Sequence, residues 1–148
     1  MTFQEEDVDS LAARGYHHGK VIDVIVGKDG GLTYTPDDIH AKTGDTVRFH
    51  FVSKNHTVTE SAFNDPCNPI HHGFDSGFKP IPAGSGEQKT FDVKVTQHEK
   101  PIWFYCKQFV PNPQNLGHCQ MGMVGGINAP SWGKNTVHEF RQRARWSY

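Results

Sequence analysis

Hydrophobic and polar residues alternate along several stretches in the middle of the chain. A period of two predicts β-strands that each bury one face. The clearest stretches are residues 20–26, 46–52 and 89–95. The apolar positions that we expect to face the core are Ile22, Val24 and Val26, then Val47, Phe49 and Phe51, and finally Phe91, Val93 and Val95.

Residues 102–106 follow a different pattern, because they are almost wholly apolar. Such a run predicts a central strand that is buried on both faces. Shorter strand candidates, bounded by Gly and Pro, occur at residues 32–35, 39–42 and 122–128. Residues 60–88 show no regular pattern, and irregular segments of that length are usually functional or held by a cross-link. Cys67 could supply the cross-link.

The two ends of the chain differ from this middle part. Residues 1–18 are polar without a clean period, so we expect an N-terminal arm. Near the other end, Phe140, Arg143 and Trp146 recur at helical spacing and predict a short helix on the outside of the domain. We expect its arginines to form a solvated face; they are Arg141, Arg143 and Arg145.

Many short strands with turns between them, and one helix, indicate an all-β sandwich or barrel. A chain of 148 residues suits a single domain with its own core. The expected organisation is therefore an arm at residues 1–18, a β domain at 19–130, and a C-terminal extension with a short helix at 131–148.

Composition excludes several classes of protein. The formal net charge is −1 at pH 7, whereas a phosphate-binding surface should leave a basic excess, so nucleic acid is not the expected partner. No apolar run reaches the length of a membrane span. The residues after Met1 lack the basic and apolar regions of a signal peptide. Neither an acid pair nor a nucleophile with a base stands out, so we do not expect an enzyme.

Four residues could together bind a metal ion. Cys106 ends the apolar strand, and His118 and Met123 follow a short distance beyond it. His56 comes after a separate, earlier strand. Two imidazoles, a thiolate and a thioether are the ligand set of a type 1 (blue) copper site, which moves single electrons. Met121 competes with Met123 for the axial position, but its spacing from His118 favours Met123.

Zinc is the main alternative metal, since Cys and His also bind it. The cysteines lack the Cys-x-x-Cys pairing of structural zinc sites, and a thioether ligand favours copper. Three cysteines fit one metal thiolate plus one disulfide. With Cys106 at the metal, Cys67 and Cys119 would pair, which points to an oxidising compartment. The alternative is three buried free thiols.

The sequence resembles the cupredoxin family, above all fungal extracellular plastocyanin-like proteins and plant phytocyanins. The segments that carry the resemblance are residues 55–59, 66–67, 75–78, 101–106 and 118–123. The resemblance implies a Greek-key β-sandwich or barrel with one type 1 copper per chain, and it implies secretion. By residue match it gives the copper ligands as His56, Cys106, His118 and Met123, and a disulfide between Cys67 and Cys119. Residues 107–117 form a longer loop than is usual in phytocyanins.

Residues next to the ligands have expected roles of their own. Asn55 and Thr57 flank His56, and the backbone N–H of Thr57 could donate a hydrogen bond to the Cys106 sulfur. The three residues also match a glycosylation sequon, but a glycan there would obstruct the site. Apolar residues of the long loop could form a rim where a redox partner docks, or could merely pack the loop onto the sandwich; they are Phe109, Val110, Pro111, Pro113 and Leu116.

Two functions use these same ligands. The first is a one-electron carrier that meets a transient redox-protein partner and works as a secreted or cell-surface monomer. The second is copper sequestration or delivery at the cell surface, without a role in electron transfer. A structural scaffold with a vestigial site is a remote third, because all four ligand types are present.

Overall fold

The computed structural model describes residues 19–147, so the arm expected at residues 1–18 lies outside the described residues. The described chain is almost entirely β-structure, with one short 3-10 turn, η1 (Lys28–Gly30), and one helix, α2 (Val137–Arg145). The strands are β1 (Val21–Val26), β2 (Tyr34–Thr35), β3 (Asp38–Ile39), β4 (Thr46–Phe51), β5 (Lys54–His56), β6 (Thr59–Ser61), β7 (Lys79–Ile81), β8 (Lys89–Lys94), β9 (Ile102–Tyr105) and β10 (Val124–Ile127).

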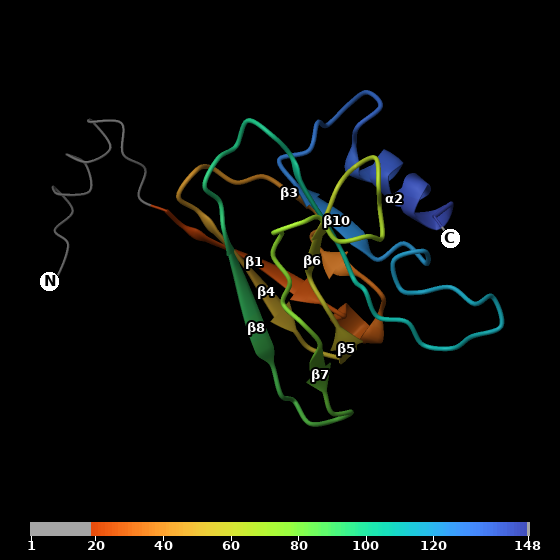
Figure 1. Ribbon diagram of the computed structural model, residues 1–148. Helices are drawn as coiled ribbons and strands as arrows, with labels where there is room; N and C mark the ends of the chain where they lie inside the picture. Colours follow the sequence, from red (N-terminus) through yellow and green to blue (C-terminus); the bar gives the residue numbers. More distant parts are fainter. Residues whose placement is uncertain (1–18, 148) are drawn as a thin grey trace, which may run out of the picture.

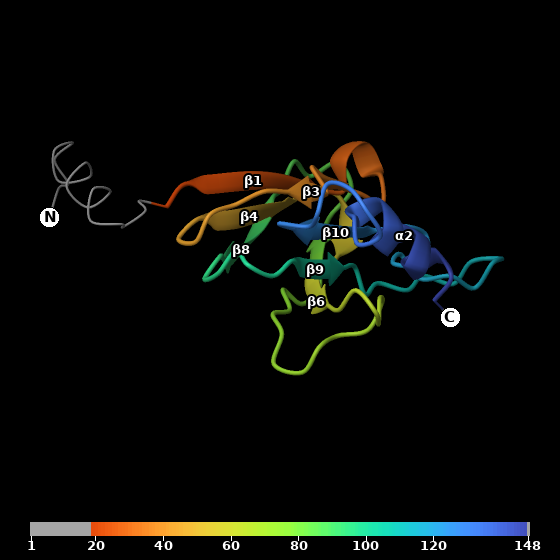
Figure 2. The same ribbon diagram turned by 90° about the horizontal axis from the view of Figure 1, so that it is seen from above.

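Two four-stranded sheets form the layers of a sandwich (Figures 1 and 2). One has the order β2-β1-β4-β8 and the other β3-β10-β9-β6, while β5 and β7 make a separate antiparallel pair. β1 lies parallel to β4, and β3 lies parallel to β10. The all-β prediction is confirmed, and of its two forms the sandwich is the one observed, because the sheets do not close into a barrel.

The core lies between the two sheets and uses the predicted alternating positions. Val24, Val26, Phe49 and Phe51 are fully buried. Phe49 meets Phe104 of the opposite sheet in an edge-to-face contact with ring centroids 5.2 Å apart, an arrangement that aromatic quadrupoles favour. Most of the expected inward faces are therefore confirmed. Phe91 is only partly buried, because β8 is an edge strand of its sheet.

Strand β9 is central and buried on both faces, as its apolar run predicts. Phe104 points into the core between the sheets. Trp103 and Tyr105 belong to a second core on the outer face, beneath α2. There the Trp103 and Phe140 rings lie 4.7 Å apart. This second core attaches the C-terminal helix to the ligand-bearing strand.

The expectation of no regular structure in residues 60–88 was partly wrong. β6 pairs with β9, and β7 pairs with β5. Each of these strands has three residues, which is too short for an alternating pattern to be recognised. Their pairing comes from neighbours far along the chain. Between β6 and β7 the chain forms a long irregular loop, visible at the bottom of Figure 2.

Helix α2 is present, but its buried face differs from the predicted one. Its buried residues are Val137, Phe140 and Ala144. Trp146 is 76% exposed, because it stands about 240° around a helix from Phe140 and follows the last turn. Arg143 lies over the Phe63 ring at 4.7 Å.

The arginines of α2 do not form one solvated face. Arg141 is partly buried, forms an ion pair with Asp37, and donates hydrogen bonds to the backbone oxygens of Gly122 and Val124. The prediction was therefore wrong for Arg141. Its position one residue after Phe140 turns it toward β10 rather than toward water.

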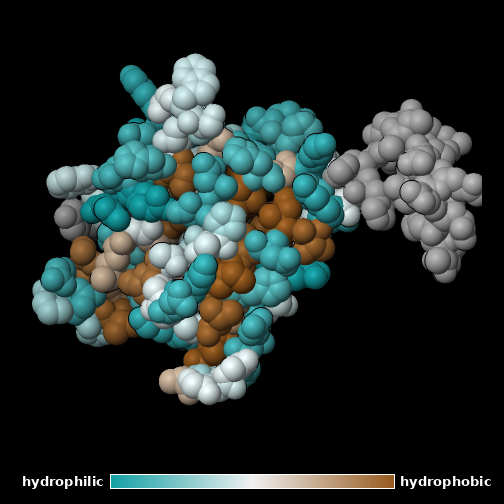
Figure 3. Space-filling view, turned by 180° about the vertical axis from the view of Figure 1, so that it is seen from behind, coloured by the Kyte–Doolittle hydropathy of each residue, from teal (hydrophilic) through white to brown (hydrophobic). Residues whose placement is uncertain are grey.

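Hydrophobic and hydrophilic residues mix on the one face of the molecule that Figure 3 shows. On the face seen from behind, apolar side chains form bands that hydrophilic residues interrupt (Figure 3). Among residues 19–147, no helix has the length and apolar character needed to cross a membrane.

Candidate metal centre

Three donor side chains meet at one end of the sandwich. His56 ends β5, Cys106 directly follows β9, and His118 lies on the loop that leads to β10. The Nδ1 atoms of the two histidines are 3.2 Å apart. The Cys106 Sγ lies 3.7 Å from Nδ1 of His56 and 3.6 Å from Nδ1 of His118. The predicted triad is therefore assembled, although its members are up to 62 residues apart.

These distances suit a trigonal metal ion. With metal–nitrogen and metal–sulfur bonds of about 2.0 and 2.3 Å, a planar trigonal centre separates its nitrogens by about 3.5 Å and each nitrogen from sulfur by about 3.7 Å. The triangle in this structure has nearly those edges. Two imidazoles and a thiolate in a trigonal plane are the arrangement that selects blue copper.

Burial sets the protonation states of the triad. His56 and Cys106 are fully buried, and His118 is 7% exposed. Desolvation, followed by the charges of His118 and Lys54, lowers the pKa of His56 to about 4. Desolvation and then Lys54 also lower the pKa of His118. Both imidazoles are neutral near pH 7, with lone pairs free for a metal.

Cys106 differs from the histidines, because it must lose a proton before it can bind a metal. Burial raises its pKa, although hydrogen bonds from Gln108 and Thr57 partly counter this. Without a metal the sulfur holds its proton near neutral pH, so a metal ion must displace that proton to bind the thiolate.

The two methionines near His118 differ in burial. Met123 is fully buried, whereas Met121 is 44% exposed. The backbone of Met123 is hydrogen-bonded to the backbones of both His118 and Cys106. Its N–H donates to the carbonyl oxygen of His118, and its carbonyl accepts from the N–H of Cys106 at 3.1 Å. Met123 is thus the methionine whose backbone lies beside two members of the triad and whose side chain is buried, while Met121 lies at the surface.

Comparison with known proteins agrees with this geometry. No family model matches the chain. The "Probable GPI-anchored cupredoxin-1" of Arthroderma benhamiae is 34% identical over 135 residues, which cover 91% of this chain and 64% of that protein. Among solved structures, reduced rusticyanin superposes with a TM-score of 0.51 at 19% identity, over 76% of this chain and 80% of the other, a likeness of fold. The chain has the fold of the cupredoxins.

One further fungal protein and one further solved structure are similar to this chain. The "Extracellular serine-rich protein" of the same fungus is 37% identical over 146 residues, covering 98% of this chain and 53% of that protein. A purple cupredoxin from Nitrosopumilus maritimus has a TM-score of 0.46 at 20% identity, over 72% of this chain and 96% of the other. The chain spans less than two thirds of the length of either fungal relative.

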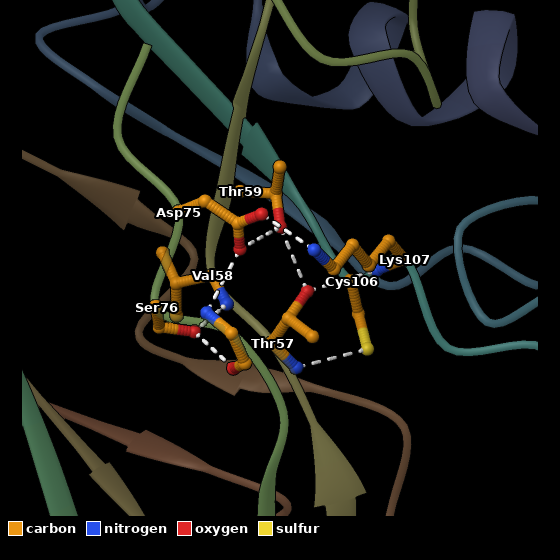
Figure 4. A network of polar contacts seen from close by, with 8 residues as sticks. Thr57, Val58, Thr59, Asp75, Ser76, Cys106 and Lys107 are labelled. Carbon is orange, nitrogen blue, oxygen red and sulfur yellow. Dashed lines mark hydrogen bonds and ion pairs between the residues drawn. The ribbon is translucent and has the colours of Figure 1, made fainter.

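The residue after His56 contacts the cysteine as expected. The backbone N–H of Thr57 donates to Cys106 Sγ at 3.4 Å. The Thr57 hydroxyl accepts from the backbone N–H of Lys107 at 3.0 Å. These two bonds, both drawn in Figure 4, tie the His56 segment to the Cys106 segment. The Oδ1 of Asn55, the residue before His56, is buried without a hydrogen-bond partner among the described residues.

A disulfide joins Cys67 to Cys119, with Cα atoms 5.7 Å apart, and leaves Cys106 as a buried free thiol. The pairing is the one that the resemblance implies, and it rules out the alternative of three free thiols. The bond links the long loop after β6 to the residue beside His118. It therefore restrains the position of a donor as well as the loop.

Two of the five loop residues predicted as a docking rim, Val110 and Pro111, lie beside His118. Phe109 and Val110 are about half exposed, at 47% and 53%. Pro111 and Pro113 are exposed, and Leu116 is partly buried. A hollow of about 260 Å³ opens beside His118 and is lined by Leu32, Lys54, Val110, Pro111, Asn112, His118 and Met121. Val110 and Pro111, two of the predicted rim residues, thus line this hollow. Leu32 and Met121 also line it, although the sequence analysis did not assign them to the rim.

Sequence analysis also missed residues that shape the site from a distance. Gly27 has a φ of +83°, and a Cβ there would stand 3.1 Å from the His56 ring and 2.4 Å from the Ser53 hydroxyl. Lys54 acts on both histidines through its charge. The glycine belongs to a turn cluster and the lysine is one of many, so neither carries a signal that could distinguish it in the sequence.

Proposed function

We propose that this chain is a cupredoxin that holds one type 1 (blue) copper ion and carries single electrons. His56 and His118 would bind through Nδ1, Cys106 through its thiolate, and Met123 weakly along the axis. The observation that supports this most is the buried triangle of donor atoms with edges of 3.2 to 3.7 Å.

Bound copper supplies a one-electron couple, and electron transfer is fast when the ligand geometry changes little between its two states. The protein limits such change by three means. His56 and Cys106 are joined through Thr57, His118 is beside a disulfide, and Met123 is hydrogen-bonded to both Cys106 and His118. A donor set filled by three strong ligands and one weak ligand leaves no open position for a substrate, so we do not propose an enzyme.

We assign the exit of the electron to the exposed edge of His118. The surrounding rim and hollow are apolar enough for a brief contact with a redox-protein partner, and such contacts are small and weak. The partner class is a protein with an apolar patch around its own redox centre. We expect the carrier itself to be a monomer, with no role for nucleic acid.

We place this chain outside the cell or on the cell surface. The disulfide requires an oxidising compartment. The fungal relatives carry the names GPI-anchored and extracellular, which supports the same location.

The test is to add Cu(II) to the copper-free protein and record visible absorption and electron paramagnetic resonance. We expect an intense blue charge-transfer band with narrow copper hyperfine splitting, lost in Cys106→Ser. Met123→Leu should alter the spectrum, and Met121→Leu should leave it unchanged, because only Met123 is buried. A pale product with ordinary tetragonal copper signals would contradict the proposal.

Storage or delivery of copper is distinguished by kinetics. A carrier shows reversible electrochemistry and fast electron self-exchange. A blue protein that exchanges electrons slowly, and releases Cu(I) only to a chelating partner, would favour sequestration instead.

A further inference from the structure

A chain of hydrogen bonds leads from the candidate thiolate to a carboxylate near the surface (Figure 4). Its direction is determined by its ends. The Lys107 backbone N–H can only donate, and it donates to the Thr57 hydroxyl. An ionised Asp75 can only accept, and its Oδ1 accepts from the Thr59 hydroxyl at 3.1 Å. The Thr57 hydroxyl must therefore donate to the Thr59 oxygen, 2.9 Å away.

Asp75 is itself firmly held at the end of this chain. Its Oδ1 also accepts from the Gly77 N–H at 2.9 Å, and its Oδ2 pairs with the Lys107 ammonium. Partial burial alone would raise the pKa of Asp75, but the hydrogen bonds from Lys107, Gly77 and Thr59 outweigh it and the pKa is lowered. The carboxylate is thus an anion near pH 7.

Two residues of this network, Thr57 and Lys107, lie next to the candidate sulfur ligand. Lys107 follows Cys106 directly and contacts Asp75 with its side chain and Thr57 with its backbone. Thr57 follows His56 and donates its N–H to Cys106 Sγ. Asp75 is therefore connected to both sides of the N–H···S bond, through Thr59 and Thr57 on one side and through Lys107 on the other.

We propose that Asp75 is a positioning residue for the metal thiolate. By accepting from Thr59 and holding Lys107, its carboxylate fixes Thr57 against Cys106 and maintains the N–H···S hydrogen bond. Such a bond tunes the potential of a blue copper site, so Asp75 affects the potential without contacting the metal. The effect on potential rests on the function proposed above, whereas the effect on Thr57 does not.

The test compares three variants. Asp75→Ala removes the acceptor and the charge, while Asp75→Asn removes the charge and keeps an acceptor oxygen. Asp92→Ala is the matched control, because Asp92 forms a similarly exposed ion pair with Arg48 on the other sheet. Amide hydrogen exchange at β4 checks that each variant retains the fold.

The first readout needs no copper. In the metal-free protein, we expect amide exchange of Thr57 and Lys107 to be about tenfold faster in Asp75→Ala, the scale of one net hydrogen bond. In Asp75→Asn and Asp92→Ala it should stay within about twofold of the parent protein. Equal exchange in all variants would overturn the positioning role.

The second readout is the Cu(I):Cu(II) ratio at a fixed applied potential. Losing the negative charge raises this ratio in both Asp75 variants, by electrostatics alone. Weakening the N–H···S bond lowers it, so Asp75→Ala should fall below Asp75→Asn. Identical ratios in these two variants would overturn the proposal. A parent protein without a blue copper signal would instead contradict the proposed function, and the exchange measurement would still test the role of Asp75.

Discussion

Single residues decide whether the donor triangle can accept a metal. His56 illustrates the requirement, because a fully buried imidazole would repel a cation if it carried a proton. Burial keeps it neutral instead and lowers its pKa to about 4. Burial also raises the pKa of Cys106. Without a metal, both the imidazole and the thiol are therefore uncharged near pH 7. Desolvation thus prepares a neutral cavity, and the metal supplies the charge.

The low pKa of His56 predicts a pH dependence of stability in the copper-free protein. Between pH 6.5 and about 4 the unfolded chain binds a proton at this residue and the folded chain does not. The free energy of unfolding therefore falls as the pH falls through this window, by about 3 kcal/mol. Denaturant unfolding at several pH values measures it. His56→Gln should show a smaller dependence, and an equal slope in both proteins would contradict the prediction.

Gly27 predicts a second effect at the scale of one residue. A side chain at Gly27 would press on the His56 ring and the Ser53 hydroxyl, whereas Gly30, also with positive φ, has open space around it. Both alanine variants bear the left-handed strain of about 1–2 kcal/mol. Gly27→Ala should lose at least about 1 kcal/mol more, as for other overpacked sites. It should also bind copper more weakly than Gly30→Ala. Unfolding curves and copper titrations of the pair test this, and equal losses would refute it.

At the scale of elements, helix α2 supports the segment that carries the axial candidate. Phe140 anchors the helix in the second core, which lies between α2 and β9. Arg141 then reaches the carbonyls of Gly122 and Val124, on either side of Met123, and pairs with Asp37 before β3. One side chain thus joins the helix to two strands of the same sheet. The C-terminal extension is therefore part of the support of the site rather than an appendage.

Replacing Arg141 tests this support. Arg141→Met keeps the apolar stem but leaves two backbone carbonyls without this donor, so we expect a loss of about 1–3 kcal/mol in the free energy of unfolding. Arg48→Met removes an exposed arginine–aspartate pair, which solvent screens, and should therefore cost less than Arg141→Met. Chemical denaturation of both variants gives the comparison. A loss no larger for Arg141 than for Arg48 would show that the contact is not stabilising.

At the scale of the whole molecule, the site lies where separate parts of the chain converge. β5 brings His56, the end of β9 brings Cys106, and the loop before β10 brings His118 and Met123. The disulfide joins this end to the long loop after β6. The result is a buried group of donor side chains that approaches the surface at His118, beside a hollow whose lining includes Leu32, Val110 and Pro111.

A charge placed on that rim should slow electron transfer without changing the centre. In the copper-loaded protein, Val110→Asp puts like charges on both partners of a self-exchange encounter, so we expect the self-exchange rate to fall about tenfold. Val21→Asp is the control, since Val21 is similarly exposed on β1. Nuclear magnetic resonance line broadening of mixed oxidation states measures the rate. A changed visible spectrum in Val110→Asp would show that the loop shapes the site rather than the docking surface.

The sequence by itself determined the parts of this protein that depend on local pattern and residue chemistry. Alternation located β1, β4 and β8, the apolar run located β9, and the identities of His56, Cys106 and His118 indicated the metal. These signals are local, because burial imposes a period on each strand and each donor type has its own metal preference. Three-residue strands such as β6 are too short to show a period.

Only the tertiary structure decided what depends on approach between distant segments. The donor triangle closes over separations of up to 62 residues. Gly27 makes room for a ring that is distant in sequence, Arg141 turns inward to β10, and Asp75 ends a hydrogen-bond chain that starts beside the thiolate. None of these roles follows from residue type, because arginine and aspartate are usually exposed, and glycine occurs both in turns and in the core. Their contacts exist only once the two sheets pack and exclude water.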